Sequence, residues 1–295
     1  MIPPNLKINF LQPISHQLLS EKKVNISILR LDLLDANWGG NKWFKLKYHI
    51  IDALSKNYKN IGSFGGPWSN HIAALAIFGK LNNLKTIGFI RCVGDITKYP
   101  TLLTAKKNGM QLSFLTNDEY ENSQNNLLLN NHESIYWIPS GGHTSLGIQG
   151  CEEILQLDCL QNELANFTHI AVSVGNGTTL SGLSKSCFDN QQLIAVPALK
   201  NANYLIDELK PFIKNKNIDW WFDYHFGGFG KSTTELFSFI DFANSSLQLP
   251  LDRVYTAKLM YGIWHKIQSN YFKPNSNILV IHTGGLQGNH HLFDK

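Results

Sequence analysis

The sequence predicts an α/β protein built on parallel sheets. Short apolar runs rich in β-branched residues recur along the chain, and stretches with helical spacing of apolar residues separate them. Glycine-rich or hydroxyl-rich segments follow several of the runs. Strands of parallel sheets are covered on both faces and therefore read as continuous apolar runs. The alternation indicates βαβ units.

The expected strands are the apolar runs 61–64, 85–90, 111–115, 135–138, 169–174, 193–196 and 278–281. The expected helices are the stretches 69–80, 101–107, 150–160, 180–187 and 233–243. The Asn-rich segment 121–131 is expected to be a surface excursion.

Composition excludes several classes of protein. The chain has 295 residues, of which 43% are hydrophobic and 16% charged, so it can bury a sizeable core and does not resemble a disordered chain. The net charge of +4 comes without a Lys/Arg cluster, which argues against a nucleic-acid partner. The longest apolar stretch, 72–78, is far shorter than the roughly 20 residues that a membrane span needs.

Targeting and cysteine patterns predict a cytoplasmic protein without metal. The N-terminal residues 1–7 lack the basic and apolar regions of a signal peptide. The four cysteines, at 92, 151, 159 and 187, have irregular spacing and form neither a disulfide framework nor a zinc motif. The eleven histidines form no HExxH pattern, and the neighbours His290 and His291 are poorly placed to share an ion, so no metal is expected.

The segment 173–182 is the most informative of the glycine-rich ones. It follows an expected buried strand, opens a helix, and contains Gly175, Asn176, Gly177, Thr178 and Thr179. Small residues let an anion approach the backbone N–H groups at a helix N-terminus, and the two threonines add hydroxyl donors. It matches neither a Walker A loop nor GxGxxG, so a single phosphate is the favoured ligand. The alternative is a tight turn with a threonine capping the helix.

Three further segments carry polar groups at expected strand ends. They are 63–71, which includes Ser69 and Asn70; 281–286, which includes Thr283; and 38–42, which ends in Lys42. Taken alone, Ser69 or Asn70 is better interpreted as a helix cap, and a lone lysine such as Lys42 is nearly always a solvated charge. Together, a candidate amine, a phosphate cradle and strand-end hydroxyls are what pyridoxal 5′-phosphate (PLP) requires.

The order of these motifs resembles the fold-type II PLP enzymes that comprise 1-aminocyclopropane-1-carboxylate (ACC) deaminase and D-cysteine desulfhydrase. The resemblance runs over nearly the whole chain. It is carried by the segments 28–32, 39–46, 65–71, 141–150, 175–182, 251–258 and 282–285. The motif at 251–258 is similar to the family's Asp-Pro-Val-Tyr sequence, and that at 282–285 to its C-terminal signature.

The resemblance implies two open, twisted parallel-sheet domains, similar to tryptophan synthase β, with the cofactor between them. Residues 1–44 and 141–295 would form the large PLP-binding domain, and 45–140 a small inserted α/β domain. It also implies a homodimer.

The resemblance also implies roles for individual residues. Lys42 would be the Schiff-base lysine, Thr283 the partner of the ring nitrogen, and Tyr255 a catalytic phenol. Gly175, Asn176, Gly177, Thr178 and Thr179 would bind the phosphate. Asn70 would face the phenolic oxygen of the cofactor, Ser69 would be catalytic near the α-carbon, and the substrate would contact Ser69, Asn70, His71 and Phe229.

Two departures from the family pattern bear on the substrate. ACC deaminases carry a glutamate directly after the tyrosine, whereas this chain has Thr256, as in the desulfhydrase branch. Phe229 stands where relatives carry a second active-site tyrosine. The resemblance therefore implies a PLP-dependent lyase or deaminase that performs α,β-elimination on a small amino acid, with D-cysteine as the leading example. The alternatives are ACC deaminase, a PLP-binding protein with weak or lost catalysis, and an unrelated nucleotide-phosphate binder.

Overall fold

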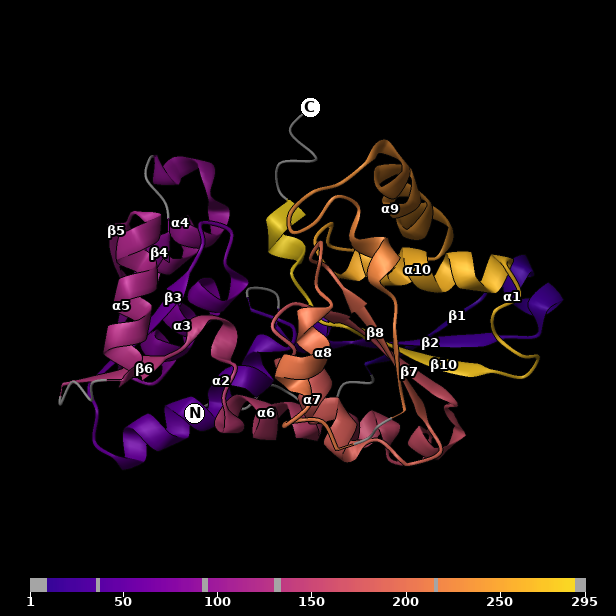
Figure 1. Cartoon of the computed structure of the whole chain (residues 1–295), viewed down its shortest axis with the longest axis horizontal. Coiled ribbons are helices and arrows are strands. Elements are labelled where there is room, and N and C mark those ends of the chain that lie inside the picture. The colour runs from indigo at the N-terminus through magenta and orange to yellow at the C-terminus, as the bar shows by residue number, and fades with distance from the viewer. Residues whose placement is uncertain (1–9, 36–37, 92–94, 130–133, 215–216, 290–295) are drawn as a thin grey trace. The chain divides into compact units, whose positions relative to one another are not determined.

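The chain forms two compact units, each with its own sheet (Figure 1). The structure is a computed structural model that describes residues 10–35, 38–91, 95–129, 134–214 and 217–289. The larger unit consists of residues 10–41 and Cys151–Asn289, and the smaller unit is Lys42–Gly150. The expected inserted domain, 45–140, falls within the smaller unit.

The larger unit is built on a six-stranded sheet. Its strands are β1 (Leu11–Ile14), β2 (Asn25–Arg30), β7 (His169–Val174), β8 (Gln192–Pro197), β9 (Ile218–Trp220) and β10 (Asn277–His282). They lie in the order β1-β2-β10-β7-β8-β9, and all neighbours are parallel except β1 with β2. The strands β7, β8 and β10 are almost wholly buried, as their apolar sequences predict.

Helices cover both faces of this sheet. They are α1 (Gln17–Lys22), α7 (Thr178–Ser186), α8 (Tyr204–Leu209), α9 (Thr234–Ser246) and α10 (Thr256–Gln268). The connections β7–α7–β8–α8–β9 advance in one direction, and the chain then returns through α9 and α10 to β10, on the other side of β7. Because such crossovers are right-handed, the returning helices lie on the opposite face from α7, as Figure 1 shows.

The smaller unit repeats this plan on four strands. They are β3 (Asn60–Gly65), β4 (Lys85–Arg91), β5 (Gln111–Leu115) and β6 (Ile135–Ile138), all parallel and in the order β5-β4-β3-β6. The helices are α2 (Lys42–Ser55), α3 (Asn70–Leu81), α4 (Pro100–Lys107), α5 (Asn117–Leu129) and α6 (Ser145–Glu152). The chain moves outward through α3 and α4 and returns through α5 to β6, so the direction reverses next to β3.

The predicted fold class is confirmed, because both sheets are parallel apart from β1 and are connected through helices. All seven expected strands form, each within about one residue of its predicted ends.

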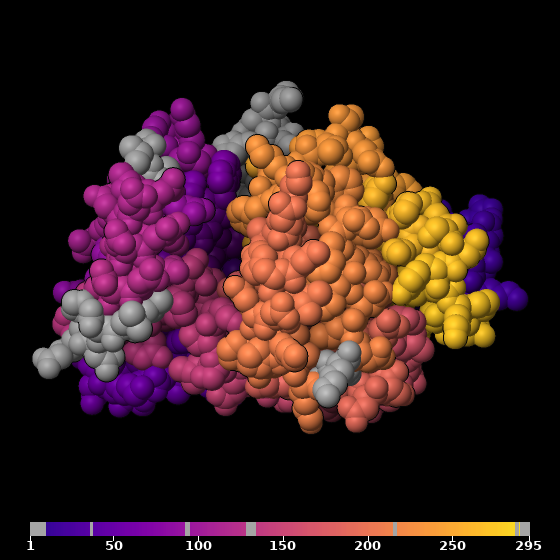
Figure 2. Space-filling view, viewed as in Figure 1, coloured from indigo at the N-terminus to yellow at the C-terminus, as the bar shows by residue number. Residues whose placement is uncertain are grey.

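The segment 121–131 lies at the surface, as expected, but most of it is helical. The helix α5, which was not among the expected helices, covers Asn117–Leu129. The residues of this helix are mostly exposed, and in the space-filling view its magenta region forms part of the surface of the smaller unit (Figure 2). A polar composition is compatible with a helix whose outer face meets solvent. Residues 130 and 131 lie outside the described residues.

The helix expected at 150–160 was misplaced. The α-helix α6 ends at Glu152, and 3₁₀ turns follow at Glu153–Gln156 and Asp158–Leu160. Leu157, between the two turns, has an extended backbone with φ −62° and ψ 141°, which ends the helical run. The apolar periodicity of this segment therefore belongs to short turns that bury their leucines.

Within the described part of the chain, no helix has the length and apolarity required to cross a bilayer. The N-terminal residues 1–7, Cys92 and the pair His290 and His291, on which expectations were also based, lie outside the described residues.

Candidate active site

The larger unit has a topological switch point between β7 and β10. These strands are parallel neighbours. The chain leaves β7 toward β8 and β9 and then returns to β10 on the other side of β7. Ligands of open α/β sheets bind at the carboxyl ends of strands at such a point. The loop 175–179 follows β7, and Thr283 follows β10, so the fold brings two of the predicted binding segments to the same edge.

The loop after β7 is shaped as an anion cradle. Gly177 has φ +80°, in the left-handed region that favours glycine, and α7 starts directly after it. The Thr178 hydroxyl donates to Oδ1 of Asn176 at 2.9 Å, so this threonine stabilises the loop itself. A Cβ at Gly175 would approach the Tyr255 hydroxyl to 3.3 Å, which places the phenol beside the loop.

Asn41 connects the two loops, and no sequence pattern had singled it out. Its side-chain amide donates to Oγ1 of Thr179 at 2.9 Å, and its backbone N–H donates to the carbonyl of Thr283 at 3.1 Å. Because the Thr179 oxygen accepts from Asn41, the hydroxyl proton of Thr179 remains available for another acceptor. The residue immediately before Lys42 is thereby fixed against both loops. The motif that contains Lys42 was the available signal, but only the lysine was recognised in it.

A buried charged network supports the strand end that carries Thr283. The Asp32 carboxylate accepts hydrogen bonds from Nε and from a terminal nitrogen of Arg30 at 2.8 and 2.6 Å. It also lies 3.1 Å from Nδ1 of His282. Burial raises the pKa of Asp32, but the hydrogen bonds and charges of Arg30 and His282 outweigh it, so the carboxyl pKa lies well below its usual range. Asp32 is therefore ionised and holds β2 and β10 together at this edge.

Tyr255 is held by the carboxylate of Asp252. One Asp252 oxygen accepts the backbone N–H groups of Val254 and Tyr255 at 2.9 and 3.0 Å. The other accepts the backbone N–H and the hydroxyl of Thr256, both at 2.8 Å. Burial, followed by the Asp252 charge, raises the pKa of the Tyr255 phenol above its usual range, so the phenol is a neutral donor at neutral pH.

Phe229 lies beside Tyr255, at the tip of a loop that a lysine anchors. The two rings meet edge to face with centroids 5.9 Å apart, and Phe229 is 54% exposed. Lys258, which is fully buried, donates to the carbonyls of Gly228 and Ala198 at 2.7 and 3.3 Å. Burial lowers the pKa of Lys258 to about 8, although the Asp252 charge opposes this shift.

The smaller unit has its own switch point, between β3 and β6. Ser69 is the N-cap of α3, because its hydroxyl accepts the backbone N–H of Ile72 at 3.3 Å. Gly65 is required here, since a Cβ would come within 2.7 Å of the Ser69 hydroxyl. Asn70 and His71 follow in the first turn, and Lys42 is the first residue of α2.

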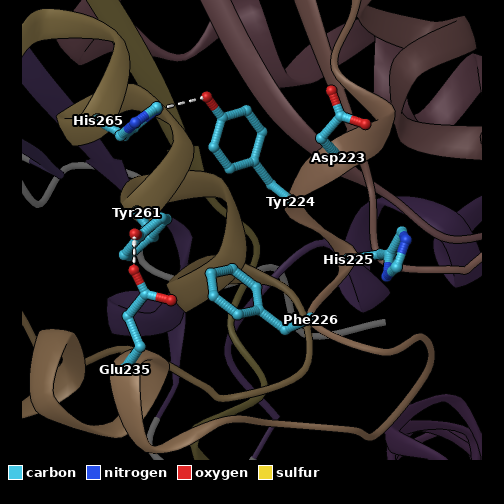
Figure 3. Close-up of a pocket in the computed structure, with 7 residues that line it drawn as sticks. All are labelled: Asp223, Tyr224, His225, Phe226, Glu235, Tyr261 and His265. Atoms are coloured by element: carbon cyan, nitrogen blue, oxygen red, sulfur yellow. Dashed lines mark hydrogen bonds between the residues drawn. The ribbon is translucent and has the colours of Figure 1, made fainter. Parts of the chain in front are cut away.

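A surface pocket of about 320 Å³ in the larger unit contains none of the predicted site residues. Its lining residues are Asp223, Tyr224, His225, Phe226, Glu235, Tyr261 and His265 (Figure 3). Two pairs of its polar side chains are bonded to each other, Tyr224 to His265 and Tyr261 to Glu235. It is therefore separate from the switch-point site.

The groups at the switch point of the larger unit fit PLP, and the smaller unit has an unpaired polar group of its own. In the larger unit, Ser173 lies in β7 with a buried hydroxyl that has no hydrogen-bond partner among the described residues, and the loop 175–179 offers a phosphate cradle. In the smaller unit, Oδ1 of Asn70 is likewise buried without a partner in the described part of the chain. Buried polar groups of this kind are normally hydrogen-bonded, so both indicate a ligand that supplies the missing contacts.

Known proteins resemble this chain over nearly its whole length, although no family model matches. A Thermotoga maritima protein named "Putative 1-aminocyclopropane-1-carboxylate deaminase" is 30% identical, and the match covers 92% of each chain. The Arabidopsis thaliana protein named "Bifunctional D-cysteine desulfhydrase/1-aminocyclopropane-1-carboxylate deaminase, mitochondrial" is 28% identical, over 91% of this chain and 73% of its own length.

Solved structures also resemble this chain over most of its length. The crystal structure of an ACC deaminase homologue is 25% identical with a TM-score of 0.83, and the match covers 96% of this chain and 91% of that one. A PLP-dependent aspartate racemase is 12% identical with a TM-score of 0.70, over 93% of this chain and 89% of its own. The second similarity shows the fold alone.

Proposed function

Since this chain belongs to the family of ACC deaminases and D-cysteine desulfhydrases, we propose that it is a lyase that eliminates the β-substituent of a small D-amino acid. Its cofactor is PLP, as the family implies. The proposed reaction converts D-cysteine and water into pyruvate, hydrogen sulfide and ammonia. The bonds broken are Cα–H, Cβ–S and, by hydrolysis, C–N.

PLP, when bound, withdraws electrons from the substrate and stabilises the negative charge at its α-carbon. In our proposal, the Lys42 amine would hold the cofactor covalently and, when free, would act as the base that removes the α-proton of the substrate. The loop 175–179 and the Thr179 hydroxyl hold the phosphate. The neutral hydroxyl of Thr283 is the hydrogen-bond partner of the cofactor's ring nitrogen. Ser69 and Asn70 orient the substrate.

The observation that supports elimination over cyclopropane opening is the environment of Thr256. Its side chain is 2% exposed and its hydroxyl is bonded to Asp252, so it offers no acid or base to a substrate. Opening the three-membered ring of ACC requires a group that acts away from the α-carbon. The glutamate that ACC deaminases carry at this position is absent from this chain.

Steady-state kinetics test the proposal directly. The purified holoenzyme should release 2-oxo acid from D-cysteine with a higher kcat/KM than from ACC or L-cysteine, and sulfide should appear in equal amount. The Lys42→Ala variant is the control for non-enzymatic sulfide release. A higher kcat/KM on ACC would overturn the choice of substrate.

ACC deaminase is the second candidate function. The names of the Thermotoga maritima and Arabidopsis thaliana relatives favour it, and the latter combines both activities in one name. The same comparison of D-cysteine with ACC separates the two functions. Ammonia with 2-oxobutanoate from ACC at the higher kcat/KM would select this candidate.

A further inference from the structure

His71 occupies the switch point of the smaller unit and is 3% exposed. It is the second residue of α3, and its ring lies against the sheet between β3 and β6. Its Nε2 atom is 2.9 Å from Oγ of Ser63 on β3, and the same oxygen is 2.9 Å from the carbonyl of Ile138 on β6. Ser63 therefore connects the imidazole to a carbonyl that can only accept a hydrogen bond.

This chain of contacts determines which nitrogen of His71 carries the proton. The Ser63 hydroxyl has a single hydrogen, and it donates that hydrogen to the carbonyl of Ile138. The hydroxyl oxygen must then accept from His71, so Nε2 is the protonated nitrogen. Burial, and then the charges of Lys42, Lys45 and His49, hold the pKa of His71 well below its usual range, so the imidazole is neutral.

The other nitrogen, Nδ1, is consequently a bare acceptor. It is buried, and no described residue makes a hydrogen bond to it. An unmade hydrogen bond at a buried acceptor destabilises the site, and a ligand that brings an N–H or O–H group removes this cost. The neighbouring residue Asn70 adds a second unpaired acceptor, Oδ1.

We infer that Nδ1 of His71 accepts a hydrogen bond from the β-hydroxyl or β-thiol of the substrate and thereby selects substrates that carry such a group. This inference rests on the proposed function. The α-amino group of the substrate is engaged by the cofactor, and its carboxylate only accepts, so the β-substituent is the remaining donor of D-serine or D-cysteine. ACC has only ring CH₂ groups there and leaves Nδ1 unpaired. His71 is thus a specificity residue that orients the substrate without exchanging a proton with it.

Two substitutions at His71 test the contacts of its two ring nitrogens separately. In His71→Gln the side-chain amide reaches the position of Nε2 and can keep the contact with Ser63, but no acceptor remains at Nδ1. In His71→Asn the amide oxygen lies near the position of Nδ1, and the contact with Ser63 is lost. Loss of the Nδ1 acceptor and loss of structural support are therefore tested by different variants.

The informative substrates are D-serine and β-chloro-D-alanine, because both eliminate a β-substituent but only D-serine carries a donor hydrogen on it. We expect His71→Gln to lower the ratio of their kcat/KM values, D-serine to β-chloro-D-alanine, by about tenfold or more. His71→Asn should keep this ratio within about threefold of the unsubstituted enzyme, even if both rates fall. An unchanged ratio in His71→Gln would overturn the inference and leave His71 as a support for α3.

Two measurements without turnover complete the test. The ¹⁵N chemical shifts of His71 in the holoenzyme should show a protonated Nε2 and an unprotonated Nδ1 at neutral pH, and the reverse tautomer contradicts the inference. Spectral titration of bound PLP should show that His71→Gln weakens D-serine binding more than D-alanine binding. If the unsubstituted holoenzyme neither binds nor turns over any of these D-amino acids, the proposed function itself is wrong, and the inference is wrong with it.

Discussion

The two switch points leave different kinds of polar group unpaired. In the larger unit, the buried groups without a partner among the described residues near β7 are the hydroxyls of Ser173 and Ser181, which can donate. At the start of α3 in the smaller unit they are Oδ1 of Asn70 and Nδ1 of His71, which accept, whereas Nε1 of Trp137 on β6 is an unpaired donor. A phosphate needs donors, whereas a substrate with a β-hydroxyl or β-thiol needs an acceptor. The donors near β7 fit our proposal that this loop binds the cofactor phosphate, and the acceptors at the start of α3 fit our proposal that His71 contacts the substrate.

The largest expected effect is that of Lys42, where the two units adjoin in sequence. Lys42→Ala should abolish covalent attachment of PLP, because this amine is the proposed attachment point. Borohydride reduction of the holoenzyme followed by peptide mapping measures it. If the reduced cofactor is found on another lysine, and Lys42→Ala does not change this, then Lys42 is not the attachment point and our assignment of the cofactor site is wrong.

Removing a donor from the larger unit should weaken cofactor binding. Thr179→Ala deletes a hydroxyl that we propose donates to the phosphate, and a hydrogen bond to a charged group contributes about 1.5–3 kcal/mol, or roughly tenfold or more in Kd for PLP. Equilibrium dialysis against free PLP measures the change.

Thr178→Ser is the matched control for this experiment. It keeps the hydroxyl that donates to Asn176 and should leave the Kd for PLP nearly unchanged. An unchanged Kd for PLP in Thr179→Ala would indicate that the segment 175–179 is only a turn.

Acid should destabilise the smaller unit through His49, which is 3% exposed. Burial lowers the pKa of His49 to about 4, although the Asp52 charge opposes the shift. Between about pH 6.5 and about pH 4 the unfolded chain binds a proton that the folded chain does not, so the free energy of unfolding falls as the pH falls. From about pH 7 to about pH 5 the loss is about 2 kcal/mol.

Chemical denaturation at both pH values measures this loss, and His49→Gln should reduce it. Hydrogen exchange would locate it, with the smaller unit losing protection before the larger. Equal loss of protection in both units would contradict the assignment of the acid-induced loss of stability to the smaller unit.

The smallest expected effect is that of Phe229. A phenol at this position would add a second donor beside Tyr255 in the larger unit. A positioned general acid typically contributes about 10²–10⁴ in rate, but this side chain is 54% exposed, so its hydroxyl would be shared with water. We expect Phe229→Tyr to raise kcat on D-cysteine by only a few-fold with little change in the Kd for PLP. A fall in kcat would mean that the exposed phenyl ring itself contributes to catalysis.

Local sequence patterns determined most of the sheets and failed at two helices. Buried parallel strands are continuous apolar runs, and their ends are recognisable without knowledge of their neighbours. The helix α5 lacks such a signal, because an exposed helix can be polar over most of its surface. At α6, Gly150 packs so closely on α2 that a Cβ would meet the carbonyl oxygen of Phe44 at 1.7 Å, and no local pattern reports that contact.

The sequence by itself determined the fold class, the strands and the segments in which the proposed site residues lie, because apolar periodicity and glycine-rich motifs are local properties of the chain. The tertiary structure alone decided which groups meet. Asn41 reaches Thr179 across 138 positions of sequence, and Ser63 stands between His71 and the carbonyl of Ile138. These contacts depend on strand order and register, which bring distant residues to one sheet edge. The acceptor role of Nδ1 follows from them, since a proton's position is set by the partners of the ring.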